Sequence, residues 1–212
     1  MGDSDSMSDD LPLLSRTPDA WGEAALRDTR ALLSDHAYLE KKAASNALEL
    51  LNRWPEPTPP ADWTTTLAAI AHDEASHLAS VLRLLARRGG RLDRTHRNPY
   101  ANALRALVRK GSGNEELADR LLISALIEAR SCERFEVLAR ASAEGDRELS
   151  RFFRRLGASE MGHYRVFLHL AGHAVGPGAV EARWAEMLEA EARILAAQAP
   201  GPRIHSGDGP AS

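Results

Sequence analysis

Hydrophobic residues recur every three to four positions through most of the chain, which is the period of one face of an α-helix. Proline and glycine clusters divide this pattern. No segment alternates hydrophobic and polar residues for long enough to indicate a strand. The pattern therefore predicts an all-α protein with helices over about 18–54, 61–88, 99–110, 115–143, 146–172 and 178–198. A bend or break of the first helix near Asp28 is left open.

The two ends of the chain differ in composition from the helical region. Residues 1–16 form an acidic, polar segment, and residues 200–212 are rich in glycine, proline and serine. Both are expected to be poorly ordered tails. They flank a single helical domain over 17–199.

Each of the four long helices carries a glutamate on its hydrophobic face, where a leucine would be expected. These glutamates are Glu40, Glu74, Glu128 and Glu160. One ionised carboxylate buried without a partner costs several kcal/mol, and a typical protein is stable by only about 5–15 kcal/mol. Neither Lys nor Arg lies on these faces, so the charge count indicates two divalent cations, which would balance four carboxylates.

The spacing of two histidines supports the same interpretation. His77 follows Glu74 by three residues and His163 follows Glu160 by three, so each pair lies on one face of its helix. A lone Glu followed by a Glu-x-x-His on the next helix occurs twice, as in ferritin-like di-metal carboxylate bundles. We therefore expect a ferritin-like four-helix bundle with additional short helices. One Glu-x-x-His alone would be weak support, and a metal-free bundle remains the alternative.

Composition limits the kind of metal site. The chain has one cysteine, Cys132, and therefore no Cys-x-x-Cys pair for a zinc ribbon or a rubredoxin-type iron. Carboxylates with one imidazole per ion suit iron or manganese. No hydrophobic run reaches the length of a membrane span, and the N-terminal residues do not read as a secretory signal, so a cytoplasmic location is expected.

Several other residues admit two interpretations. His36 precedes Glu40 by one turn and is either a satisfied core histidine or a hydrogen-bonding partner or ligand at the metal site. Cys132 either borders the metal cavity or serves as a small hydrophobic residue. His72 and His169 fall off the hydrophobic faces and are expected at the surface. A solvated helix face is the simplest interpretation of the last group of glutamates, Glu181, Glu186, Glu189 and Glu191.

Four segments resemble one enzyme family over about residues 18–198. They are "DHAYLEKKAASNALELL", "AHDEASHLASVL", "LLISALIEARSCERFEVLA" and "ASEMGHYRVFLHLA". They are similar to the tRNA-(2-methylthio-N6-isopentenyladenosine) hydroxylases, the MiaE family of non-haem di-iron monooxygenases. The resemblance implies two iron ions held by Glu40, Glu74, His77, Glu128, Glu160 and His163. It also implies hydroxylation of the isopentenyl side chain of a modified adenosine beside the tRNA anticodon, with O2 and two electrons from an external donor such as a ferredoxin and its reductase.

The charge distribution bears on tRNA as a partner. The net charge is -3, but residues 83–110 hold nine Arg and Lys residues against one acid. This segment is interpreted as a surface for tRNA phosphates, with Arg88, Arg91, Arg94 and Arg97 as the candidate contacts, or as an ordinary solvated loop.

Three further functions stay open at this point. One is another ferritin-like oxidase or peroxidase, either rubrerythrin-like or a manganese catalase. A second is a non-enzymatic iron-binding protein, which would need a shell-forming oligomer to store iron, whereas a monomer or dimer is expected here. The third is a purely structural bundle.

Overall fold

The computed structural model describes residues 10–209, and every regular element in that range is an α-helix. Four long helices form the bundle: α2 (Thr29–Leu50), α3 (Trp63–Arg87), α5 (Asn114–Ala141) and α6 (Arg147–Val175). Three shorter helices pack around them: α1 (Asp19–Leu26), α4 (Pro99–Arg105) and α7 (Pro177–Ala196). This arrangement confirms the predicted all-α bundle with additional short helices. None of the described helices is long and apolar enough to cross a membrane.

The first predicted helix is divided at Asp28. Its backbone leaves the helical conformation, and its side chain accepts a hydrogen bond of 3.0 Å from the backbone N–H of Ala31. This is the usual role of an aspartate at a helix N-cap, and it begins α2 in a new direction after α1. The break that the periodicity left open is therefore present.

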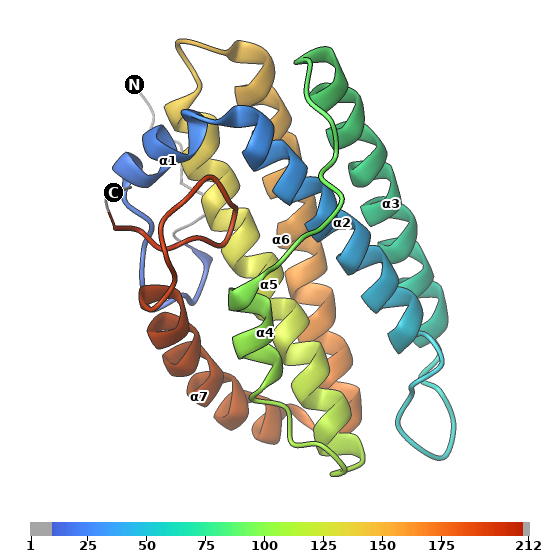
Figure 1. The fold of residues 1–212 in the computed structure, drawn as a ribbon. Helices are drawn as coiled ribbons and strands as arrows, with labels where there is room; N and C mark the ends of the chain where they lie inside the picture. The colour runs from blue at the N-terminus through green and yellow to red at the C-terminus, as the bar shows by residue number, and fades with distance from the viewer. Residues whose placement is uncertain (1–9, 210–212) are drawn as a thin grey trace, which may run out of the picture.

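The long helices pack as two antiparallel pairs, α2 with α3 and α5 with α6. In Figure 1, α3 and α5 run in the same direction, so the chain must return along the bundle between them. Residues 88–113 make this return and include α4, which Asn98 caps through a hydrogen bond from the N–H of Ala101. Two pairs joined by one long crossover are the ferritin-like arrangement.

The hydrophobic core consists of two clusters, one toward each end of the bundle. On α3, for example, Leu67 and Ile70 belong to one cluster, Val81 and Leu84 to the other, and Glu74 lies between them. On α6 the order along the chain is reversed, with Glu160 between Leu156 of the second cluster and Phe167 of the first. Polar side chains are therefore placed at one level of the bundle, between two apolar layers.

Residues after α7 fold back over the bundle near α1 and α5 (Figure 1). Ile204 is fully buried, and His205 and Ser206 are almost so. Arg134 of α5 donates hydrogen bonds to the carbonyl oxygens of Ile204 and Ser206, at 2.7 and 2.6 Å. The expectation of a poorly ordered tail over 200–212 therefore does not match residues 200–209, because a buried guanidinium holds their backbone.

The other predicted tail is only partly described. Residues 1–9 and 210–212 lie outside the described residues. Within 10–16, Leu11 and Leu13 are buried against the core. Their two apolar side chains anchor this segment, which its acidic composition did not indicate.

Candidate metal centre

The structure brings the predicted ligands together from all four long helices. Glu40 comes from α2, Glu74 and His77 from α3, Glu128 from α5, and Glu160 and His163 from α6. All four carboxylates are buried, none more than 6 % exposed. Ligand atoms of Glu40, Glu74, His77 and Glu160 lie within 4.8 Å of one another. The spacing of these residues in the sequence therefore corresponds to one compact cluster.

The ring of His77 faces three carboxylates with no hydrogen bond to them. Its Nδ1 atom lies 3.3 Å from Oε1 of Glu160, 3.5 Å from Oε2 of Glu40 and 3.8 Å from Oε2 of Glu74. None of these contacts has hydrogen-bond geometry, so this buried nitrogen has no hydrogen-bond partner among the described residues. A nitrogen and several oxygens directed at a common point are what a metal ion requires.

His163 occupies the equivalent position on α6. Its Nδ1 atom lies 3.0 Å from Oε2 of Glu160, in hydrogen-bond geometry, and 2.7 Å from Oε1 of Glu74, outside it. The buried Oε1 of Glu74 therefore also lacks a hydrogen-bond partner in the described structure. Buried polar atoms are rarely left without partners, so these two orphaned atoms mark a place for a cation.

The electrostatics of the cluster disfavour a full set of negative charges. Burial raises the pKa of Glu40, Glu74 and Glu128, for Glu128 well above its ordinary value, and neighbouring carboxylates raise it further. Burial disfavours a protonated His77, but Glu160, Glu40 and Glu74 outweigh this effect and raise its pKa to about 12. The same balance raises the pKa of His163 to about 11. These pKa shifts show that the site favours positive charge among its carboxylates, such as that of a bound cation.

His36 hydrogen-bonds to one of the clustered glutamates. Its Nε2 atom lies 2.5 Å from Oε1 of Glu40, and its ring packs among Phe135, Phe152 and Phe153. Burial lowers the pKa of His36 to about 4. Of the interpretations left open, the structure therefore favours a histidine that orients a carboxylate of the cluster.

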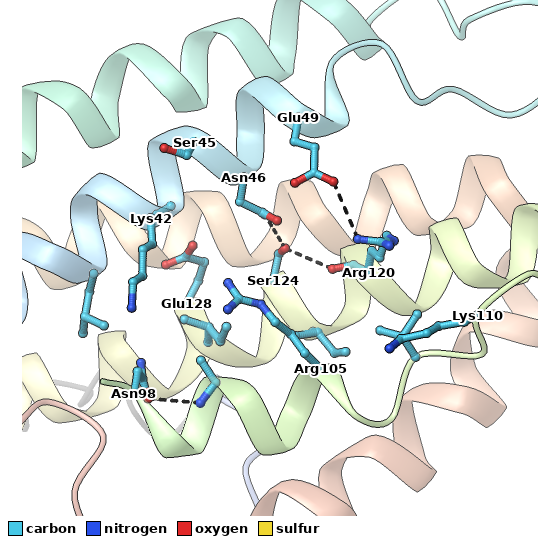
Figure 2. A pocket seen from close by; sticks show the side chains of 16 residues that line it. Lys42, Ser45, Asn46, Glu49, Asn98, Arg105, Lys110, Arg120, Ser124 and Glu128 are labelled. Atoms are coloured by element: carbon cyan, nitrogen blue, oxygen red, sulfur yellow. Dashed lines mark hydrogen bonds and ion pairs between the residues drawn. The ribbon is translucent and has the colours of Figure 1, made fainter. Parts of the chain in front are cut away.

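A cavity of about 520 Å³ reaches the cluster from one side, between α2, α4 and α5. Glu128 forms part of its wall, as Figure 2 shows. Apolar side chains make up much of the remaining lining: Leu39, Ala43, Ala101, Val108, Ile123 and Ile127. A molecule in this cavity would thus have an apolar environment with one carboxylate of the cluster beside it.

Four cations also line the cavity: Lys42, Arg105, Lys110 and Arg120. Arg105 and Lys110 are exposed. Lys42 contacts Nδ1 of His96 at 2.8 Å, and Nε2 of His96 contacts Asp35 at 2.7 Å. Burial, with Arg105 nearby, lowers the pKa of Lys42. The cavity therefore combines an apolar lining with a positive border, which suits a ligand that is part apolar and part anionic.

Comparison with known proteins gives a consistent result. The family model of the tRNA-(MS[2]IO[6]A)-hydroxylases (MiaE) matches residues 8–206. The chain belongs to the MiaE family. It is 42% identical over 192 residues, 90% of each chain, to the tRNA 2-(methylsulfanyl)-N(6)-isopentenyladenosine(37) hydroxylase of Pseudomonas putida. A shorter match, 38% identical over 91 residues, joins 43% of the chain to 32% of the Salmonella typhimurium hydroxylase of that name.

A solved structure confirms the fold. The chain is similar to a Synechococcus protein described as having aldehyde deformylating oxygenase activity, with a TM-score of 0.82 and 31% identity. The match covers 92% of this chain and 96% of that one. The bundle therefore resembles that of an oxygenase whose named activity differs from that of the MiaE family.

The four arginines predicted to contact phosphate are in different environments in this MiaE family member. Arg91, Arg94 and Arg97 are exposed on the crossover. Arg88 instead forms ion pairs with Asp146, in two contacts, and with Glu148 at 3.2 Å. Its guanidinium already has two carboxylate partners, so the structure separates Arg88 from the other three.

Three further interpretations can be compared with the structure. The prediction that the glutamates of α7 are exposed is correct for Glu181, Glu186 and Glu189. It is wrong for Glu191, which is fully buried. Glu191 pairs with Arg130, whose position on α5 gave no sign of such a partner. Cys132 is buried and its thiol donates to the carbonyl oxygen of Gly157. His72 and His169 are exposed as expected.

Proposed function

We propose that this MiaE family member is a di-iron monooxygenase. It would hydroxylate the isopentenyl side chain of 2-methylthio-N6-isopentenyladenosine in tRNA, using O2 and two electrons from an external donor such as a ferredoxin and its reductase. The observation that carries the proposal is the position of the cavity, which joins a positively charged border to a carboxylate of the metal cluster. We expect a cytoplasmic enzyme that acts as a monomer or dimer.

The donor set fits two iron ions. Glu40, Glu74, His77, Glu128, Glu160 and His163 would hold them, with four negative charges balancing two divalent cations. The orphaned atoms of His77 and Glu74 support this assignment. Manganese suits the same donors. Six residues leave coordination positions open, and iron bound here would supply the activation of O2 needed to oxidise an unactivated C–H bond.

The remaining residues would hold these groups and the substrate in place. His36 would fix the orientation of Glu40 through its hydrogen bond. The apolar side chains that line the cavity, Leu39 and Ile127 among them, would surround the isopentenyl group and exclude water from it. Amide and hydroxyl groups of Asn46 and Ser124, which bond each other at 2.9 Å, face the same cavity and would contact the base. A volume of about 520 Å³ is within the range of small-molecule sites.

Cations would bind the tRNA backbone around this entrance. Arg105 and Lys110 lie at the cavity itself, and Arg91, Arg94 and Arg97 lie on the crossover that leads to it. Phosphate contacts position a nucleic acid, while a base splayed out of a loop is recognised in a pocket. Arg88 is left out of this proposal because of its ion pairs with Asp146 and Glu148.

The experiment supplies iron-loaded protein with O2, a reductant and tRNA from cells that lack this gene. Nucleoside mass spectrometry should show one added oxygen atom on the isopentenylated adenosine. Glu128→Ala and His163→Ala should lose metal and turnover while circular dichroism shows that the helices survive. Glu189→Ala, on an exposed part of α7, is the matched control. Full hydroxylation by either ligand variant would refute the ligand assignment.

The Synechococcus structure defines the alternative outcome. If the iron-loaded protein leaves tRNA unchanged but deformylates an aldehyde, the chain is an oxygenase of a different substrate class. Disproportionation of peroxide without any reductant would instead indicate a catalase-like or peroxidase-like enzyme. A large shell-like assembly measured by light scattering would indicate iron storage. Each of these results would overturn the tRNA proposal.

A further inference from the structure

Three metal-binding side chains meet at a second place, outside the carboxylate cluster. Asp62 precedes α3, and His169 and His173 lie one turn apart on α6. His169 comes six residues after His163, which is about 9 Å along the helix axis. All three side chains are accessible to solvent. The group is therefore a surface feature at the end of the bundle where the 51–62 connection enters α3.

The distances within this group match those between ligands of one ion. Nε2 of His169 lies 3.2 Å from Nε2 of His173 and 3.0 Å from Oδ2 of Asp62, and Nε2 of His173 lies 3.6 Å from Oδ1 of Asp62. Ligands about 2.0–2.1 Å from a tetrahedral zinc ion are separated by about 3.3 Å. The three side chains thus already form an open triangle of suitable size.

Hydrogen bonds alone satisfy this arrangement poorly. Nε2 of His169 faces both Asp62 and Nε2 of His173, yet a ring nitrogen offers either one proton or one lone pair. One proton cannot point well at two partners in different directions. A cation between the three atoms would instead accept a lone pair from each. The two imidazole planes are nearly perpendicular, at 78°, so the contact is not ring stacking.

Asp62 gives an independent sign that its side chain is directed at a ligand. It occupies the N-cap of α3, where an aspartate ordinarily accepts a hydrogen bond from a backbone N–H of the first turn. Its side chain makes no such bond. It is turned toward α6 instead, which forgoes a local stabilising contact in favour of the two histidines.

We propose that Asp62, His169 and His173 form a second metal site, which binds a borderline divalent cation such as Zn²⁺. Two neutral imidazoles and one carboxylate are typical zinc ligands, whereas Mg²⁺ and Ca²⁺ require mainly oxygen donors. Water would complete the coordination. Because the ligands come from α6 and from the residue that begins α3, a bound ion would fasten these two helices together at the end of the bundle.

The test uses untagged, iron-loaded protein titrated with Zn²⁺ in a calorimeter, with bound zinc and iron measured by elemental analysis after dialysis. Wild-type protein should bind one equivalent of zinc while its iron is retained. The double variant His169→Ala/His173→Ala should bind zinc at least tenfold more weakly, and Asp62→Asn should be intermediate. His72→Ala removes an exposed histidine of α3 outside the group and should bind zinc like wild type.

Thermal unfolding supplies a second readout. Zinc should raise the Tm of wild type and of His72→Ala but not that of the double variant, since a ligand stabilises only a protein that it binds. Equal zinc binding by wild type and the double variant would overturn the proposal, as would zinc binding only by displacement of iron. The double variant should retain its iron and its hydroxylase activity, so a negative result here is distinguishable from failure of the proposed function.

Discussion

The guanidinium of Arg130 and the carboxylate of Glu191 form a fully buried ion pair between α5 and α7. Two contacts join them, from Nε to Oε1 at 2.9 Å and from Nη2 to Oε2 at 3.1 Å. The hydroxyl of Tyr100 donates a further hydrogen bond to Oε1, at 2.9 Å. α4, α5 and α7 therefore meet at one carboxylate, and α5 is also the helix that carries Glu128.

Removal of that carboxylate should destabilise the protein strongly. Glu191→Ala leaves Arg130 buried with only part of its neutralising charge, from Glu133 at 3.1 Å. Breaking a buried pair typically costs about 3–5 kcal/mol. For a chain of this length, a loss of 3 kcal/mol lowers Tm by roughly 6–12 °C. Calorimetry of Glu191→Ala beside Glu189→Ala measures this difference, and similar Tm values for the two variants would contradict a structural role for the pair.

His36 should influence the metal centre without being a ligand in it. His36→Leu places an apolar side chain against Phe135 and Phe153 and removes the hydrogen bond to Glu40. Loss of such a supporting contact typically weakens metal binding by about 10–100-fold. An iron titration of the variant measures the change. Phe152→Leu, which alters the same aromatic group without touching Glu40, is the control, and equal affinity in both would exclude the positioning role.

The segment after α7 should contribute to stability despite its composition. Ile204 is fully buried, so Ile204→Ala should cost about 2–5 kcal/mol through lost burial and a cavity. Denaturant unfolding measures this cost. Arg193→Ala, at an exposed position of α7, should change stability by less than about 0.5 kcal/mol. A similar small change for Ile204→Ala would mean that the segment detaches readily in solution.

His205 should make stability depend on pH. Burial lowers its pKa well below 6.5, and nearby Arg134 and Arg130 lower it further. The unfolded chain therefore binds a proton below pH 6.5 while the folded chain does not, so stability rises with pH through this range and falls as the solution becomes acidic. The loss between pH 7.5 and 5.5 should be about 1.4 kcal/mol.

His205→Gln isolates this contribution, since glutamine keeps polar contacts toward Ser131 and Asn98 but does not titrate. Contributions to pH dependence that the two proteins share cancel when their slopes of stability against pH are compared. The variant should have the shallower slope from pH 7.5 to 5.5. Identical slopes would show that His205 is not held neutral in the folded protein.

Arg91 and Arg94 should matter for tRNA affinity and not for the metal. Arg91→Ala/Arg94→Ala should weaken tRNA binding at low salt and reduce the slope of log K against log salt by about two, one for each lost phosphate contact. Filter binding over a range of salt concentrations measures both quantities. Arg151→Ala/Arg154→Ala, which removes two exposed arginines of α6, is the control with the same change in net charge. An unchanged slope in the double variant would remove the crossover from the proposed interface.

The long helices and the six clustered residues could be predicted because both depend on local periodicity. Hydrophobic spacing defines which side of α3 or α6 is buried, and a glutamate on that side stands out against its neighbours. Glu74 and Glu160 each begin the Glu-x-x-His of a repeated helix pair, and this equivalence predicts that they lie at the same height along the bundle. Whether these six residues are the metal ligands stays a prediction.

Features that depend on contacts between distant segments could not be predicted in this way. Glu191 lies one turn after Met187 and one turn before Leu195, on the buried face of α7, so periodicity could have indicated its burial. Its partner Arg130 comes from α5 and could not be predicted from that pattern. The position of Ile204 depends likewise on a distant residue, because Arg134, seventy residues earlier in the chain, donates a hydrogen bond to its carbonyl oxygen. Glycine and proline indicate that such a segment is not helical, but they do not indicate which surface of the bundle it packs against.

The buried position of Arg134 makes one end of the bundle depend on the segment that follows the last helix. Its guanidinium is satisfied by Ile204, Ser206 and Asp208, which follow all seven helices in the chain. Until these residues are in place, the guanidinium lacks the two carbonyl oxygens that accept its hydrogen bonds, and water must solvate it instead. The segment after α7 thus completes the packing around Arg134, and a chain cut before residue 204 would leave this buried charge without three of its partners.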